Sequence, residues 1–95
     1  MKTLPSELAP YKRTPTFTEQ SVPVGLTRAH KTKAGTWGKI VILKGQLLYR
    51  ILEPQLEEVL LSENHHGVVE PAVPHEVEPQ GKVEFFVEFY AAAGE

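Results

Sequence analysis

Hydrophobic and polar residues alternate along the second half of the chain with the period of two that is typical of β-strands. The alternation is clearest over 82–90. One face of this segment carries Val83, Phe85, Val87 and Phe89. The run 39–43 is instead almost continuously apolar and β-branched, which predicts a strand buried on both faces. The pattern therefore indicates an extended chain rather than a set of helices.

Shorter segments of similar composition extend this prediction over most of the chain. We expect further strands over 25–31, 46–52, 57–61, 68–69 and 76–78. Lys44 and Gly45 predict a turn between two separate strands, and the two prolines of 71–74 predict a break before His75. About seven short strands, with turn signals roughly every eight to twelve residues, favour an all-β sandwich or barrel over an α/β fold.

Four prolines divide the first 24 residues and exclude an uninterrupted helix or a central strand there, because each proline lacks an amide donor. They are Pro5, Pro10, Pro15 and Pro23. Apolar residues in this segment can still pack on a sheet edge, so we expect a Pro-rich arm over 1–24 that packs on the barrel. The main β-domain then covers 25–90, and 91–95 is expected to be a frayed tail.

Length and composition narrow the classes of function. Ninety-five residues fit one small domain, and the formal charge of -2 gives no basic excess for a nucleic-acid partner. No apolar run approaches the roughly 20 residues that span a bilayer, and the start lacks the apolar core of a signal peptide. We therefore expect a soluble, unprocessed protein with no membrane partner. The absence of Cys excludes disulfides, thiolate metal sites and cysteine nucleophiles, and it favours the cytoplasm.

The four histidines are the natural candidates for binding chemistry, because neutral imidazole is the commonest metal ligand. His30 lies in a predicted strand, and His75 follows a Pro-rich break that can direct its side chain inward, so the two could meet in the interior. Equally, each could be a half-buried strand histidine whose ring is bonded to the backbone. His65 and His66 are adjacent in a polar loop, where only one of them could face a given site.

Charged residues supply the other candidates. Glu88 lies on the last strand, and Glu78 lies three residues beyond His75, which in strict strand geometry places Glu78 on the opposite face. Arg28 shares a face with His30 in the predicted strand and could hold a carboxylate or an oxyanion. For each of them an ordinary surface charge is the alternative. The G-x-x-x-x-G-K, G-x-S-x-G and H-E-x-x-H motifs are absent, which excludes the common nucleotide-binding, serine-hydrolase and zinc-protease classes.

Three segments resemble the TehB/YeaR-like domain of the cupin superfamily, and the resemblance extends over about residues 13 to 90. The segments are 24–30 (VGLTRAH), 31–45 (KTKAGTWGKIVILKG) and 69–79 (VEPAVPHEVEP). The resemblance implies a single-domain, cupin-like small β-barrel of the jelly-roll type, and a homodimer. It also implies an association with tellurite resistance, or with nitrate- and oxidant-related stress responses in bacteria, without a settled reaction.

Cupins bind a divalent metal through an H-x-H motif, a downstream Glu and a later His that project into the barrel. In this chain Arg28 stands in place of the first His, His30 matches the second, Gly38 lies near the Glu position, and His75 matches the later His. Two of the four usual ligands are therefore missing. The resemblance leaves room for a site in which His30 and His75 bind Zn²⁺, Fe²⁺ or Ni²⁺ together with a carboxylate or water. The carboxylates considered for it are Glu88 and Glu78.

These observations give three hypotheses for function. The first is a stress-related, cupin-like protein that binds a small polar metabolite or oxyanion in the barrel, with a divalent metal as an optional cofactor. Its ligand-binding residues would be Arg28, His30, Tyr49 and His75. The second is a metal-dependent cupin enzyme, dioxygenase- or isomerase-like, that uses His30 and His75. The third is a dimeric accessory or regulatory module that buries the apolar strand 82–90 between two copies.

Overall fold

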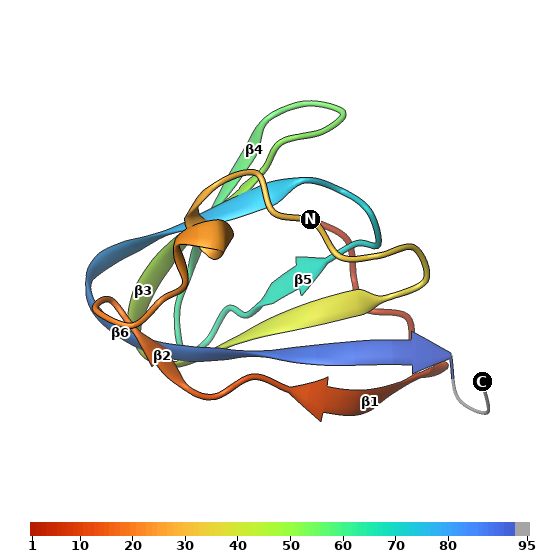
Figure 1. The fold of residues 1–95 in the computed structure, drawn as a ribbon, viewed down its shortest axis with the longest axis horizontal. Coiled ribbons are helices and arrows are strands. Elements are labelled where there is room, and N and C mark those ends of the chain that lie inside the picture. Colours follow the sequence, from red (N-terminus) through yellow and green to blue (C-terminus); the bar gives the residue numbers. More distant parts are fainter. Residues whose placement is uncertain (93–95) are drawn as a thin grey trace.

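The regular secondary structure of the chain is almost entirely β-strand. The computed structural model describes residues 1–92, in which six strands and one short 3₁₀ helix follow one another (Figure 1). They are β1 (Leu8–Arg13), β2 (Phe17–Thr18), η1 (Val24–Thr27), β3 (Trp37–Ile51), β4 (Glu57–Leu61), β5 (Gly67–Val69) and β6 (His75–Ala92). The all-β class predicted from the sequence is confirmed. No helical segment within 1–92 has the length and apolar character that crossing a bilayer requires.

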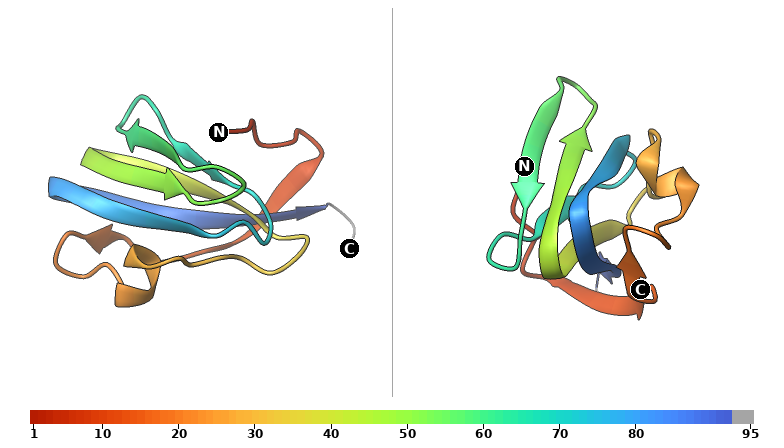
Figure 2. Two further views of the ribbon diagram at one scale, coloured as in Figure 1. Left: turned by 90° about the horizontal axis from the view of Figure 1, so that it is seen from above. Right: turned by 90° about the vertical axis from the view of Figure 1, so that its left-hand side faces the viewer.

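All six strands belong to one antiparallel sheet. Its order is β1-β6-β3-β4, with β2 added to β6 and β5 added to β3. β3 and β6 form its centre, because they pair along most of their lengths, from Trp37 with Tyr90 to Ile51 with His75. Within residues 1–92 the outer strands β1 and β4 do not pair with each other, so the sheet is curled but not closed (Figure 2). The jelly-roll barrel expected from the resemblance is therefore not shown.

The two central strands bend near their middles, and the sheet folds over onto itself (Figures 1 and 2). The bend coincides with two register shifts against β6, one after Ile42 and one after Gly45. Bulges of this kind bend a strand and increase its twist. They also switch the inward face of β3 from even to odd positions. The buried residues of β3 are accordingly Ile40 and Ile42 before the bend, and Leu47, Tyr49 and Ile51 after it.

The sequence pattern predicts two short strands in each of two regions where the structure has one long strand. The turn predicted at Lys44 and Gly45 is wrong, because the positive φ of Gly45, +81°, produces a bulge within the 15-residue strand β3 instead of a chain reversal. In the same way 76–78 and 82–90 are parts of the 18-residue strand β6, which passes through Pro79 and Gly81 without a break. Glycine with positive φ serves a turn and a bulge equally well, so composition alone does not distinguish them.

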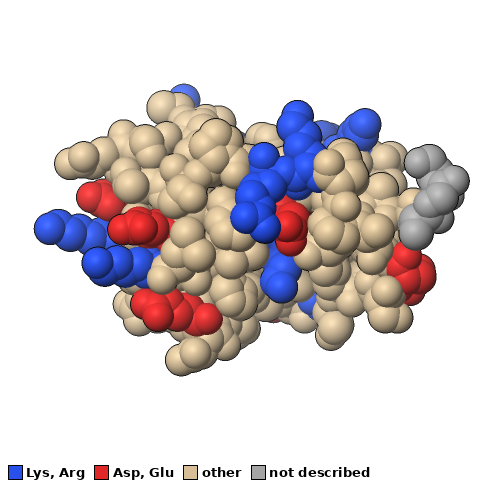
Figure 3. Space-filling view, turned by 90° about the horizontal axis from the view of Figure 1, so that it is seen from below, with Lys and Arg blue, Asp and Glu red and all other residues tan. Residues whose placement is uncertain are grey.

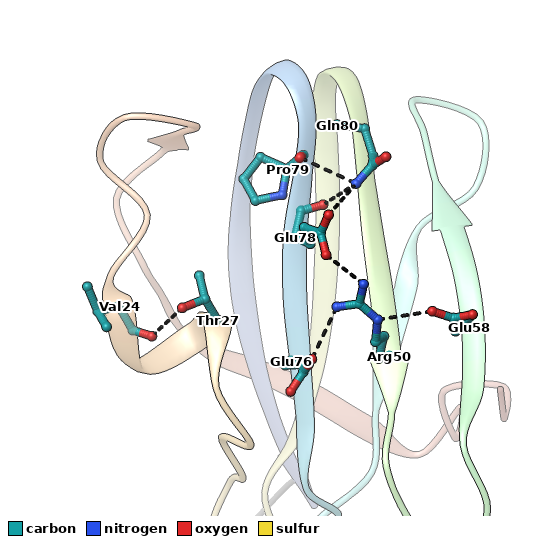
Figure 4. Close-up of polar contacts among 8 residues, drawn as sticks. All are labelled: Val24, Thr27, Arg50, Glu58, Glu76, Glu78, Pro79 and Gln80. Carbon is teal, nitrogen blue, oxygen red and sulfur yellow. Dashed lines mark hydrogen bonds and ion pairs between the residues drawn. The ribbon is translucent and has the colours of Figure 1, made fainter.

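The core lies between the two halves of the folded sheet. The alternation predicted for 82–90 is confirmed, because the side chains of Val83, Phe85 and Val87 are buried. The prediction that 39–43 is buried on both faces is wrong, since Leu43 is 47% exposed. The outer face is mostly solvated, and a charged network lies across it. Arg50 of β3 is bonded there to the carboxylates of Glu58, Glu76 and Glu78 (Figure 4).

The proline-rich segment contributes β1 and β2, both of which pair with β6. Between them, the Thr14 amide donates to the Val87 carbonyl at 2.9 Å, and the Val87 amide donates to Thr14 Oγ1 at 3.0 Å. The strand predicted over 25–31 is wrong, because the chain turns there into η1, where Thr27 Oγ1 donates to the Val24 carbonyl (Figure 4). Of the predicted tail, 91–92 extend β6, and 93–95 lie outside the described residues.

Gly45 offers a direct test of the bend. A Cβ atom at this position would lie 2.1 Å from the Lys82 carbonyl oxygen. We expect Gly45→Ala to lower the free energy of unfolding by more than about 2 kcal/mol, because a backbone clash is added to the strain of a left-handed alanine. Gly81→Ala is the matched control, since Gly81 has φ +80° and nothing within 4 Å of its Cβ position. Urea unfolding measures both variants, and equal losses would contradict this account.

Candidate functional site

A cavity of about 290 Å³ lies over the inner face of the sheet, where η1 and the loop after it cover the core. Its walls are mainly the apolar side chains of β3, β5 and β6. They include Ile40, Val69, Val77, Phe85, Val87 and Phe89. Leu26 of η1 and Thr14 of the arm complete the rim, and two histidine rings supply the strongest polar groups. Among the described residues, 1–92, no Lys, Arg or Glu contributes to the lining.

His30 and His75 are brought together by the backbone at this cavity. The amide of each donates to the carbonyl of the other at 2.7 Å, which forms an isolated antiparallel bridge between the loop after η1 and the first residue of β6. The two rings lie edge to face with centroids 5.4 Å apart, and both line the cavity. The sequence allowed such a meeting, although it placed His30 in a strand that the structure does not contain.

His75 is 4% exposed, and its ring is held from several sides. Its Nδ1 lies 3.2 Å from the Val73 carbonyl oxygen. Because a carbonyl only accepts, Nδ1 must carry the proton, and in the neutral ring Nε2 then carries the lone pair. The Tyr49 ring packs against the imidazole with centroids 5.8 Å apart. Burial lowers the pKa of His75, and the nearby His30 lowers it further, while the bond to Val73 acts in the opposite direction.

His30 is less enclosed, but one of its nitrogens is isolated. Within residues 1–92, Nδ1 of His30 is a buried side-chain nitrogen without a hydrogen-bond partner. An unpaired buried polar atom of this kind typically costs about 1–3 kcal/mol. The alternative in which both histidines are fully bonded to the backbone therefore holds for Nδ1 of His75 but not for the His30 ring.

Tyr49 packs against His75 but does not itself line the cavity. Its side chain is 1% exposed, and its hydroxyl donates to the Val68 carbonyl at 2.9 Å. Burial raises the pKa of this hydroxyl, and the negative charges of Glu70 and Glu57 raise it further. Tyr49 is therefore neutral, and its hydroxyl is occupied within the sheet.

The charged candidates lie outside the cavity lining. Arg28 is exposed at the end of η1. Glu78 lies on the outer face of β6, where its hydrogen bond and charge interaction with Arg50, 2.5 Å away, lower the pKa of the carboxyl (Figure 4). Glu88 accepts hydrogen bonds from the Tyr90 hydroxyl at 2.7 Å and from Arg13 at 3.0 Å, and these bonds lower the pKa of Glu88.

On the face that carries β1, the negative charge of Glu88 is balanced by a neighbouring arginine. Arg13 of β1 pairs with Glu88, and its guanidinium also lies 4.2 Å above the Phe86 ring. In Figure 3, basic groups surround an acidic one near the centre of this face, and basic and acidic groups are mixed toward one end. Positive charge on this face is thus interspersed with negative charge.

The adjacent histidines of the polar loop have separate places. His65 is exposed and belongs to a tight turn closed by reciprocal backbone bonds with Ser62. His66 is half-buried, and its Nδ1 accepts a hydrogen bond from the Ile42 amide at 3.0 Å. His66 directly precedes β5, whose pairing with β3 runs from Gly38 to Ile40, so its ring bonds an amide just beyond the end of that pairing.

Several cavity residues were not identified from the sequence. Leu26 was assigned to a strand, and Thr14 was treated only as part of the arm. The alternation of β6 does indicate that Val77, Phe85 and Val87 share the inner face. It gives no sign that η1 leaves a cavity above them, because that depends on how a proline-rich segment without a regular repeat crosses the sheet.

The buried state of His75 can be checked through the pH dependence of stability. Its pKa lies below 6.5 in the folded protein, so the unfolded chain binds more protons as the pH falls below about 6.5, and stability is lost with acidification. We expect His75→Phe to flatten this part of the pH profile of the unfolding free energy. His65→Phe, in the exposed turn, is the control that keeps the wild-type slope. A profile unchanged by His75→Phe would argue against a buried neutral imidazole.

Known proteins resemble this chain in both sequence and fold. The chain is 39% identical over 77 residues to the probable S-adenosyl-L-methionine-dependent methyltransferase TehB of Haemophilus influenzae strain Rd. The matched region covers 77% of this chain and 27% of that protein. A crystal structure of TehB from H. influenzae superposes with a TM-score of 0.84 and 34% identity, over 92% of this chain and 32% of that one. A protein of E. coli K12 matches over 97% of this chain and 98% of its own, with a TM-score of 0.87 and 20% identity, which shows a shared fold alone.

These relatives correct the functional hypotheses drawn from the sequence. The polar- or anion-binding cupin, the metal-dependent cupin enzyme and the dimeric accessory module are all wrong, because the H. influenzae TehB relatives are named as probable S-adenosyl-L-methionine-dependent methyltransferases. The divalent metal is wrong as the cofactor for the same reason. In agreement, residues 1–92 contain no group of three or more His, Cys, Asp or Glu side chains placed to hold a metal ion. Glu78 and Glu88 are instead bonded to arginines.

The family is shown by a match over most of the chain. The sequence model of the TehB-like domain covers residues 12–87, from the end of β1 to the second half of β6. This range includes η1, both cavity histidines and the bend of β3. The comparisons support the TehB-like part of the expected resemblance and do not extend it to the cupin superfamily. The chain belongs to the TehB-like domain family.

Proposed function

We propose that this chain takes part in methyl transfer from S-adenosyl-L-methionine as the domain that binds a small, mainly apolar methyl acceptor. The observation that carries the proposal is the apolar cavity of about 290 Å³ beside His30 and His75. The methyltransferase relative supplies the reaction class. The chain spans about a quarter (27%) of that relative, so the activity of the whole relative enters here only as part of the proposal.

The size and lining of the cavity limit the ligand. Small-molecule pockets usually measure about 300–1,000 Å³, and an apolar cavity of about 150 Å³ already binds benzene. A volume of about 290 Å³ therefore suits a molecule of one ring or a similar number of heavy atoms. Walls of Ile, Val, Leu and Phe favour a neutral ligand, because a charge moved from water to such surroundings has to be paired.

The residues present do not fit S-adenosyl-L-methionine itself. This cofactor carries a sulfonium, an ammonium, a carboxylate and a ribose. Nucleotide-type ligands commonly rely on an acidic side chain at the ribose hydroxyls and on backbone amides at a helix N-terminus. Among residues 1–92 the cavity lining has no carboxylate, Lys or Arg, and its helical segment is a four-residue 3₁₀ turn. We therefore place the methyl donor on a separate methyltransferase domain or chain.

The proposal is tested with toluene as the probe and two variants on η1. We expect wild-type protein to bind toluene with a dissociation constant that is roughly millimolar or tighter, a range set by the probe's size. Leu26→Trp, at the rim of the cavity, should weaken binding by about tenfold or more by filling the space. Val24→Trp is the matched control, since Val24 is 64% exposed and outside the lining.

Binding is followed by NMR shifts of the methyl groups of Val77 and Val87, which line the cavity. Calorimetry with S-adenosyl-L-methionine is the companion experiment, and no heat of binding is expected. Absence of toluene binding, or equal binding by the two tryptophan variants, would refute the proposal. Stoichiometric binding of S-adenosyl-L-methionine that shifts the same methyl groups would also refute it.

We also propose that the chain is a cytoplasmic homodimer, but through a different surface from the one first expected. Both edges of strand 82–90 are paired, with β3 on one side and with the two strands of the arm on the other, so this strand has no free edge for pairing between copies. Within residues 1–92, β4 pairs with β3 on one side and has no strand on the other, and its Leu60 is 47% exposed. Light scattering should give about twice 10.6 kDa, and Leu60→Lys should give the single-chain mass. A single-chain mass for the wild type would exclude the dimer.

A further inference from the structure

One nitrogen of His75 is available to a ligand, and its chemical state follows from its neighbours. Nδ1 donates to the Val73 carbonyl, so Nε2, on the opposite side of the ring, is a hydrogen-bond acceptor. In the described part of the chain the buried nitrogen without a partner is Nδ1 of His30, which means that Nε2 of His75 is not sealed within protein. His75 is only 4% exposed and lines the cavity, which is therefore the open space beside its ring.

We propose that Nε2 of His75 accepts a hydrogen bond from the bound methyl acceptor. The ligand class is then a neutral, mainly apolar molecule that carries one hydroxyl or thiol group. This inference rests on the proposed function, because it names the acceptor that the cavity would hold. The low pKa that burial gives His75 agrees with it, since a protonated ring would lose the lone pair.

The same hydrogen bond lets the cavity distinguish the acceptor from its methylated product. Methyl transfer forms an O–CH₃ or S–CH₃ bond on the acceptor, breaks the S–CH₃ bond of the sulfonium to leave a neutral thioether, and releases the hydroxyl or thiol proton to water. The product therefore has no donor left for Nε2. An acceptor atom in an apolar cavity then loses its partner and cannot regain water easily. Sites built around one such bond discriminate strongly against analogues that lack the donor. His75 thus favours binding before the reaction and release after it.

The ring is held rigidly enough for this role. The Val73 carbonyl fixes one edge, and the rings of His30 and Tyr49 contact it with centroids 5.4 and 5.8 Å away. The backbone bridge between His30 and His75 fixes the main chain at the same point. A polar group that is held in place before binding loses little freedom when the ligand arrives. His30 is therefore a positioning residue for Nε2 of His75, the nitrogen that accepts the hydrogen bond.

The test compares phenol with toluene, which has nearly the same shape but no donor. The affinity of wild-type protein for each probe is measured by NMR titration and compared with that of His75→Phe, which keeps an aromatic ring and removes the nitrogen. The quantity compared is the ratio of the affinity for phenol to the affinity for toluene, in the wild type and in His75→Phe. Hydration of the free probes is the same in both experiments, so its contribution cancels. We expect this ratio to be about tenfold greater in the wild type.

A second readout does not depend on the variant. In ¹⁵N-histidine-labelled wild-type protein, phenol should shift the Nε2 resonance of His75, whereas toluene should leave it largely unchanged. If neither probe binds, the proposed function fails and this inference fails with it. If toluene and phenol bind with the same preference in both proteins, and phenol leaves the Nε2 resonance unmoved, the cavity stands and the role of His75 is refuted.

Discussion

The antiparallel pairing of β3 with β6 is the interaction on which the rest of the structure depends. These strands, of 15 and 18 residues, carry most of the buried side chains, and every other strand is attached to one of them. A sheet of such long strands would expose one apolar face if it stayed flat. The bulges around Gly45 fold it over instead, so that the inner faces of the two halves cover each other. The hydrophobic core is thus made within a single sheet.

The cavity is a consequence of the same construction. A folded sheet covers its inner face well near the bend and less well at the open end, where a separate segment must cover it. Here that segment is η1 and its following loop, which supply few large side chains, and it is fastened to β6 through the His30 and His75 backbones. The two histidines therefore hold the cover in place as well as lining the space beneath it. A change at either position acts on both.

The parts predicted correctly from the sequence are those in which a side-chain pattern reports directly on burial. The alternation of 82–90 is one case, and the strand at 57–61 is another. The errors arise where the same residues serve two structures, as with Gly45, whose positive φ forms a bulge in place of a turn. The segment 25–31 also alternates, but within residues 1–92 its pairing is limited to the single bridge between His30 and His75, and one bridge does not make a strand.

The candidate site was predictable to a similar extent. The proline break before His75 correctly suggested that its ring turns inward, toward His30. The carboxylates were misleading, because a sequence does not show which cation each will meet. Arg50 and Arg13 bind Glu78 and Glu88 on the outer surface, away from the histidines. Without them the cavity has two imidazoles among apolar walls, which changes the expected ligand from an anion or a metal to a neutral molecule.

The charge distribution also explains how a methyltransferase relative and an apolar cavity can belong to one function. Methyl transfer from a sulfonium joins a charged donor to an acceptor that becomes less polar as it reacts. A single pocket that suits one of them is poorly suited to the other, because charge favours water or paired charges, while an apolar product favours dry walls. A domain that handles only the acceptor avoids this conflict. The absence of Lys, Arg and Glu from the lining, among residues 1–92, is then what the proposed division of roles requires.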